Sequence, residues 1–100
     1  MTKARVLIVE DDVDFREGLE LLVVREGFEV RGAGNLAEAR SALEEGPFDV
    51  LLADRHLPDG SGLALMEETE LVAGADFVVM TGDADVGSAV AALRHGALDY

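Results

Sequence analysis

Side chains suited to metal and phosphate chemistry follow three apolar runs of this 100-residue sequence. They are Glu10, Asp11 and Asp12 after the run at 5–9, Asp54 at the end of the run at 48–54, and Thr81 after the run at 77–80. Carboxylates that converge on one place repel each other unless a cation lies among them. Mg²⁺ suits such oxygen ligands and leaves positions open for phosphate and water. Beside such an ion, Asp54 could attack a phosphoryl group as a nucleophile, and Thr81 could donate its hydroxyl to a phosphoryl oxygen.

These side chains meet only if the three runs are strands of one parallel sheet. The expected strands span 5–9, 28–31, 48–54 and 77–80, and the expected helices span 13–26, 36–45, 63–72 and 86–96. A turn is expected at 32–35 and the start of a fifth strand at 97–100. The alternation of strands and helices with short connections predicts an α/β fold, a doubly wound parallel sheet with helices on both faces. The carboxyl ends of its strands then share one edge, where ligands bind in such sheets.

Each acidic residue also has a purely structural explanation. Asp11, Asp12 and Asp14 suit the positive end of the helix at 13–26, and Asp54 alone suits a turn. Taken singly, these are the more common roles of such residues. The joint placement of acidic residues and Thr81 at three strand ends is what favours a binding site.

Residues 32–37 match a loose Gly-x-Gly-x-x-Ala pattern that is typical of dinucleotide-binding loops. The strand expected before this pattern is short and polar. In addition, Asn35 followed by Glu38 predicts the capped start of a helix. We therefore expect a capping turn at this position rather than a nucleotide site.

Composition limits the classes of function. Hydrophobic residues make up 49% of the chain, which allows the core of one small domain spanning 1–100. The sequence has no cysteine and no apolar stretch long enough to cross a bilayer, so we expect neither disulfides nor a membrane span. It begins without a secretory signal, which favours a cytoplasmic location. The net charge of −13 argues against direct binding of nucleic acid.

The motifs and their order resemble the receiver domain of bacterial two-component response regulators. The resemblance covers the whole chain and rests on the segments 7–12, 51–54, 57–62, 80–82 and 89–100, with Arg16 after the first of them. The last segment resembles the nitrogen-regulatory, enhancer-binding branch of these proteins. The family implies a flavodoxin-like fold with the strand order 2-1-3-4-5. It also implies a role in phosphorelay signal transduction that leads to transcription regulation.

The resemblance implies a phosphorylation site and a switch. Asp54 matches the aspartate that accepts a phosphoryl group from a histidine kinase or a phosphotransfer protein. Thr81 matches the hydroxyl that swings towards the phosphoryl group. Tyr100 matches the aromatic residue that turns inward when it does.

The resemblance also implies a Mg²⁺ site that includes Asp54. Asp11 matches the direct metal ligand, Glu10 matches its acidic neighbour that acts through water, and the backbone carbonyl of His56 matches a third protein ligand. The spacing back from Arg16 favours Glu10 and Asp11 as the acidic pair, and Asp12 is an additional candidate. We expect the side chain of His56 to face solvent.

The family pattern continues beyond Tyr100 with a lysine, a fifth strand and a fifth helix. We expect the chain to be a receiver domain truncated before these elements, with an output domain in the missing C-terminal part. Weakened phosphorylation and lowered stability are the expected consequences. The strand at 77–80 would be an uncovered edge, which favours association into a dimer.

The expected function is a signalling switch rather than an enzyme for an outside substrate. One alternative is a small Mg²⁺-dependent phosphotransferase or phosphatase with an aspartyl nucleophile. Such an enzyme would use two aspartates two residues apart after the first strand, a spacing that Asp12 and Asp14 have. A second alternative is a pseudo-receiver that docks a partner without being phosphorylated. The absent lysine favours this second alternative, and the intact acidic residues argue against it.

Overall fold

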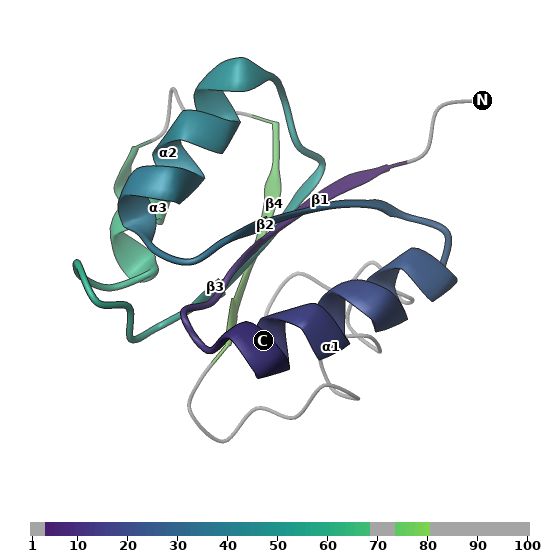
Figure 1. Cartoon of the computed structure of the whole chain (residues 1–100). Coiled ribbons are helices and arrows are strands. Elements are labelled where there is room, and N and C mark those ends of the chain that lie inside the picture. The colour runs from purple at the N-terminus through teal and green to yellow at the C-terminus, as the bar shows by residue number, and fades with distance from the viewer. Residues whose placement is uncertain (1–3, 69–73, 81–100) are drawn as a thin grey trace.

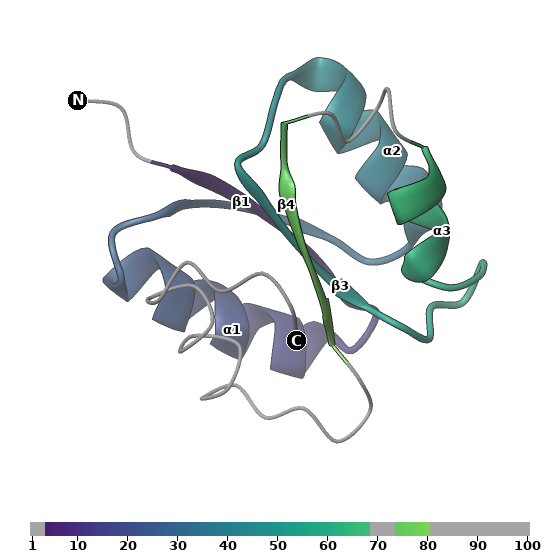
Figure 2. The ribbon, with the colours of Figure 1, turned by 180° about the vertical axis from the view of Figure 1, so that it is seen from behind.

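The structure, a computed structural model of the chain, describes residues 4–68 and 74–80. The elements are β1 (Arg5–Val9), α1 (Val13–Arg25), β2 (Glu29–Ala33), α2 (Leu36–Glu45), β3 (Val50–Asp54), α3 (Leu63–Glu67) and β4 (Asp76–Met80). The four strands form one parallel sheet in the order β2-β1-β3-β4. Helices α2 and α3 cover one face of the sheet and α1 covers the other (Figures 1 and 2). The predicted doubly wound fold is thereby confirmed.

Two apolar cores explain why β1 and β3 are continuous apolar runs. Successive side chains of a strand point to opposite faces of the sheet, so both faces of a central strand must be apolar. The core under α2 and α3 contains Leu7, Val9, Leu36, Ala39, Leu43, Leu51, Ala53 and Leu65. The core under α1 contains Val6, Ile8, Leu19, Val23, Leu52 and Val78. In β1 and β3, polar residues are therefore confined to the strand ends.

Side-chain caps start the two long helices where the sequence predicts. Asp12 accepts a hydrogen bond from the N–H of Phe15 at 3.0 Å, which satisfies a free donor at the start of α1. At α2, Asn35 accepts a hydrogen bond from the N–H of Glu38 at 2.8 Å. The carboxylate of Glu38 in turn accepts a hydrogen bond from the N–H of Gly34 at 2.8 Å.

Strand β2 differs from its prediction. It extends through Gly32 and Ala33, so the prediction of a turn at these two residues was wrong. Both pair with the last two residues of β1. A Cβ at Gly32 would collide with the carboxylate of Glu20 and lie 3.2 Å from the side chain of Arg16. The glycine therefore leaves room for the side chains of Glu20 and Arg16, which extend from α1 over the strand. The turn begins only after Ala33.

The remaining differences concern element ends. Helix α3 ends at Glu67, before the predicted end near 72, and residues 69–73 lie outside the described part of the chain. The helix predicted at 86–96 and the strand predicted at 97–100 also lie outside it. None of the helices in the described part has both the length and the hydropathy needed to cross a bilayer.

Candidate functional site

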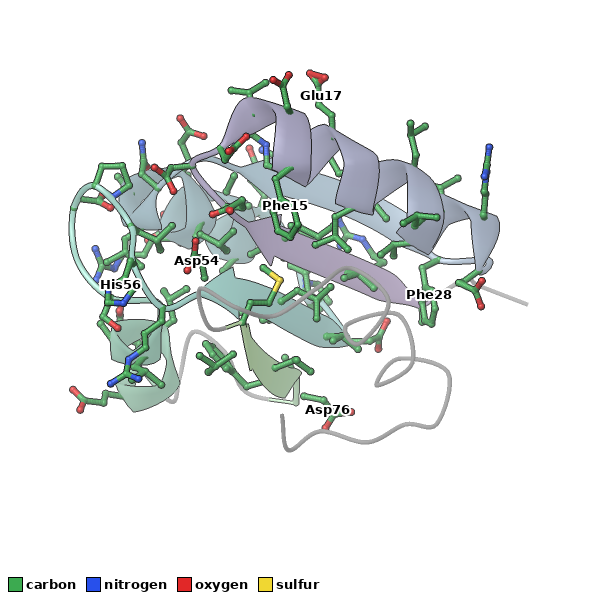
Figure 3. All side chains as sticks on the ribbon, turned by 90° about the horizontal axis from the view of Figure 1, so that it is seen from below. Phe15, Glu17, Phe28, Asp54, His56 and Asp76 are labelled. Carbon is green, nitrogen blue, oxygen red and sulfur yellow. The ribbon has the colours of Figure 1, made fainter. Side chains whose placement is uncertain are left out.

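Three carboxylates meet at the carboxyl edge of the sheet, where β1 and β3 end side by side. Val9 and Ala53 are partners in the parallel ladder, so the residues after them, Glu10 and Asp54, reach the edge together. Each of Glu10, Asp11 and Asp54 offers one oxygen, and these oxygens lie within 4.8 Å of one another. Figure 3 shows Asp54 at this edge. We call these three residues the acidic group; its donor set fits a hard divalent cation.

Glu10 is strongly affected by its surroundings. Glu10 is 7% exposed, and it is the one buried charged or polar residue among residues 4–68 and 74–80. Burial, a hydrogen bond with Asp54, and the charges of Asp54 and Asp11 together raise the pKa of Glu10 to about 8. A cation among the three carboxylates would offset this effect, because it favours the charged form.

Backbone contacts fix the acidic pair at the end of β1. The N–H of Glu10 donates to the carbonyl of Ala33 at 2.9 Å, and the guanidinium of Arg16 donates to the carbonyl of Glu10 at 2.7 Å. The N–H of Asp11 donates to the carboxylate of Glu10 at 3.0 Å. The turn after β1 is thus held from β2 and from α1, which limits how far the two carboxylates can move.

The loop after Asp54 folds back onto the end of its own strand. The N–H of His56 donates to the Asp54 carboxylate at 3.0 Å, and the N–H of Gly62 donates to the Asp54 carbonyl at 3.1 Å. A Cβ at Gly62 would collide with that carbonyl and lie 3.0 Å from the Cβ of Ala53. Glycine at 62 therefore permits a close approach of backbone to backbone that holds Asp54 in place.

The predicted site residues do not all come together. Asp12 is outside the acidic group and caps α1, which is its structural explanation. The side chain of His56 is exposed, as expected. Asp14 lies inside α1, so the Asp12 and Asp14 pair required by the phosphatase alternative does not extend from a strand end. Thr81 and Tyr100 lie outside the described residues, and their switch roles stay predictions.

Asp59 makes a contact that the sequence does not predict. Its two carboxylate oxygens accept hydrogen bonds from the N–H groups of Leu36 and Ala37, at 2.8 and 3.1 Å. The bond to Leu36 is the main reason that the pKa of Asp59 is lowered, although desolvation acts in the opposite direction. No local pattern could have revealed this contact, because the capped helix lies 23 residues earlier in the chain.

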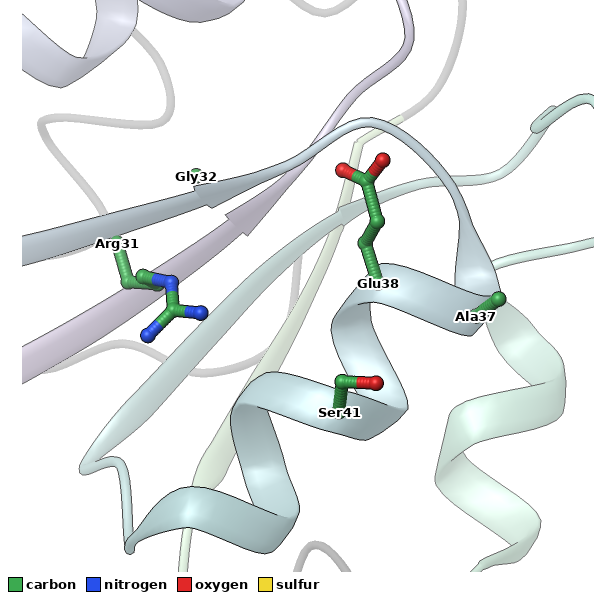
Figure 4. Close-up of a pocket in the computed structure, with 5 residues that line it drawn as sticks. All are labelled: Arg31, Gly32, Ala37, Glu38 and Ser41. Carbon is green, nitrogen blue, oxygen red and sulfur yellow. The ribbon is translucent and has the colours of Figure 1, made fainter.

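The Gly-x-Gly-x-x-Ala segment lies beside a surface hollow of about 350 Å³ (Figure 4). Arg31, Gly32, Ala37, Glu38 and Ser41 line the hollow, and none of them belongs to the acidic group. The N–H groups at the start of α2 already donate to the side chains of Asn35 and Asp59. They are therefore not available to a phosphate, which argues against a nucleotide site here.

Fold and site together define a flavodoxin-like domain whose acidic group, suited to a divalent cation, includes an aspartate at a strand end. Within this class, the family model of the response regulator receiver domain matches residues 6–100. The chain belongs to this family.

Three related proteins illustrate the match. The chain is 40% identical to the response regulator protein PilR of Pseudomonas aeruginosa and 36% identical to the DNA-binding transcriptional regulator NtrC of Proteus hauseri. Each alignment includes the whole chain but only 23% of PilR and 21% of NtrC. The likeness to NtrC agrees with the expected resemblance to nitrogen-regulatory proteins. A crystal structure of a response regulator from Burkholderia pseudomallei, with a phosphorylated aspartic acid, a calcium ion and citrate, aligns with a TM-score of 0.77. It is 33% identical, over 97% of this chain and 58% of that one.

Proposed function

We propose that Asp54 accepts a phosphoryl group from a histidine kinase or a phosphotransfer protein, with Mg²⁺ bound at the acidic group. The observation that carries the proposal is the convergence of Glu10, Asp11 and Asp54, whose oxygens lie within 4.8 Å of one another. The phosphorylated aspartate and calcium ion of the Burkholderia pseudomallei structure support the same assignment. In the transfer, a carboxylate oxygen of Asp54 forms a bond to phosphorus as the bond from phosphorus to the donor histidine nitrogen breaks. The nitrogen keeps the electron pair of the broken bond.

The residues around Asp54 have separate tasks in this proposal. Mg²⁺, when bound, would neutralise the charge that gathers on the phosphoryl oxygens. Glu10, Asp11, Asp54 and the backbone carbonyl of His56 would hold the ion. The N–H of His56 orients the Asp54 carboxylate through its 3.0 Å hydrogen bond. Arg16 keeps the Glu10 backbone in place, so the acidic pair stays beside Asp54.

In this proposal the domain acts as a switch whose state changes on phosphorylation. It does not convert an outside substrate. Phosphorylation replaces the single negative charge of the Asp54 carboxylate at the edge of the sheet with a phosphoryl group that carries up to about two. Thr81 and Tyr100 are the proposed residues that relay this change to an output domain beyond the receiver domain. The cytoplasm is the proposed location, and DNA contact belongs to the output domain rather than to this acidic chain. Dimerisation through the edge at β4 is a further part of the proposal.

Phosphorylation with acetyl phosphate tests the proposal without knowledge of the kinase. Intact-mass measurement is expected to show one added phosphoryl group in the presence of Mg²⁺ and little with EDTA. Hydroxylamine is expected to remove the group, because an acyl phosphate reacts with this nucleophile and a phosphoserine does not. A label that forms equally well with EDTA, or that resists hydroxylamine, would contradict the proposal.

A further inference from the structure

Asp59 ties the loop after Asp54 to a helix on the face of the sheet. It lies between Leu57 and Gly60, which pair with each other through backbone hydrogen bonds of 2.9 and 3.2 Å. From the tip of this turn, the Asp59 carboxylate reaches the first two N–H groups of α2. A carboxylate at this position also interacts favourably with the helix dipole. The contact is therefore a charged, two-point attachment between the loop and α2.

The start of α2 is capped twice, and the two caps differ in what they connect. Asn35 caps the helix from the adjacent position in the chain through its bond to the N–H of Glu38. Asp59 caps the N–H groups of Leu36 and Ala37 from a distant segment. Because the local cap already marks the helix start, the additional consequence of Asp59 is to fix the position of the loop that carries it.

A short path leads from the tip of this loop to the acidic group. Leu57 packs against the core under α2 and α3, and a Cβ at Gly60 would lie only 2.8 Å from Leu36. His56, whose carbonyl is the proposed metal ligand, is the residue before Leu57. Its N–H also holds the carboxylate of Asp54. His56 and Asp54 thus lie within five residues of Asp59 along the chain. A displacement of Asp59 would therefore also displace a proposed metal ligand and the phospho-acceptor.

We propose that Asp59 is a positioning residue for phosphorylation, which holds the loop at 55–61 beside Asp54 by attaching the tip of that loop to α2. This inference rests on the proposed function of Asp54. It predicts that loss of the attachment weakens metal binding and slows phosphorylation by more than the loss of helix capping alone explains. Small displacements of groups that position a reacting centre have large effects on rate.

Asp59→Ala and Asn35→Ala form a matched pair for the test, because each removes one side-chain cap from the same helix. Both are expected to lower the urea midpoint of unfolding, because each leaves N–H groups at the start of α2 without their side-chain acceptor. At a temperature where circular dichroism shows every variant folded, MgCl₂ titration followed by amide NMR measures the metal dissociation constant. We expect this constant to rise by about three- to tenfold in Asp59→Ala and to stay within about twofold of wild type in Asn35→Ala. Asp59→Asn, which keeps one acceptor oxygen, is expected to fall in between.

The outcomes of these experiments separate this inference from the proposed function. Equal Mg²⁺ affinity and equal rates of acetyl phosphate labelling in Asp59→Ala and Asn35→Ala would overturn the role of Asp59 while leaving that of Asp54 intact. A wild-type protein that neither binds Mg²⁺ nor becomes labelled would overturn the proposed function. In that case, hydrogen exchange of the backbone amides at 55–61 tests whether Asp59 attaches this loop to α2. Faster exchange in Asp59→Ala than in Asn35→Ala would support it, and equal exchange would overturn it.

Discussion

Carboxylate oxygens of Glu10 and Asp54 lie within 4.8 Å of each other at the edge of the sheet, although the two residues are 44 positions apart in the chain. Parallel pairing of β1 with β3 forces them together, since Val9 lies opposite Ala53. Without a cation, burial and this proximity together disfavour the charged form of Glu10. The same proximity makes the pair, with Asp11, a suitable oxygen ligand set for a divalent ion. Mutual repulsion and metal affinity thus have a common geometric origin.

Stability without metal is expected to depend on pH through Glu10. Its folded-state pKa, about 8, lies above the ordinary value, so between about pH 4.5 and 8 the folded protein binds a proton that the unfolded chain has released. This contribution to stability is fully present below the ordinary pKa and is lost as pH rises through the folded-state pKa. Urea unfolding with EDTA should therefore give a higher midpoint at about pH 6 than at about pH 8.5.

Two comparisons check that this pH dependence belongs to Glu10. In Glu10→Gln the loss of stability between the two pH values should be clearly smaller. In the wild type, saturating Mg²⁺ should raise the midpoint at the higher pH, because the ion binds only the folded state. Identical pH profiles for wild type and Glu10→Gln would contradict the assignment.

Substitutions of Asp11 and Asp12 are expected to have different effects, one on metal binding and the other on the stability of α1. Asp12→Ala removes the cap of α1 and should lower the free energy of unfolding by about 0.5–2 kcal/mol, with little change in Mg²⁺ affinity. Asp11→Ala should weaken Mg²⁺ binding by about tenfold or more, because it removes a proposed direct ligand. Without metal it should not destabilise the fold, since one source of repulsion disappears. Urea unfolding and MgCl₂ titration of both variants measure the two effects, and the reverse pattern would assign the ligand to Asp12.

Gly62→Ala is expected to destabilise the fold and to displace the loop after β3. The added Cβ would collide with the carbonyl of Asp54, and the overpacking should cost about 1–3 kcal/mol in the free energy of unfolding. Acetyl phosphate labelling of Asp54 should become slower, because that carbonyl accepts the N–H of Gly62. Gly18→Ala is the control: nothing lies within 4 Å of its added Cβ, and α1 should gain up to about 1 kcal/mol. Equal stability of the two variants would show that the close approach at Gly62 is unimportant.

The fold and the acidic group were largely predictable because both depend on local patterns. The apolar run at 5–9 coincides with β1, and burial on both faces requires the polar residues to follow it. The end of β2 was not predictable, because Gly32 is also a common turn residue and its real role depends on α1 lying over it. The contacts of Asp59 and Gly62 depend on where the loop after β3 lies in the folded chain. These contacts are specified by tertiary structure, and the sequence around each residue contains no signal for them.

Peptide mapping of the phosphorylated protein tests the central claim most directly. After labelling with acetyl phosphate and Mg²⁺, tandem mass spectrometry should locate the phosphoryl group at Asp54 in the wild type. The Asp54→Asn variant, treated in the same way, should carry no corresponding group. A phosphoryl group at another residue of the wild type, or an adduct that persists at wild-type level in Asp54→Asn, would contradict the assignment of Asp54 as the phospho-acceptor.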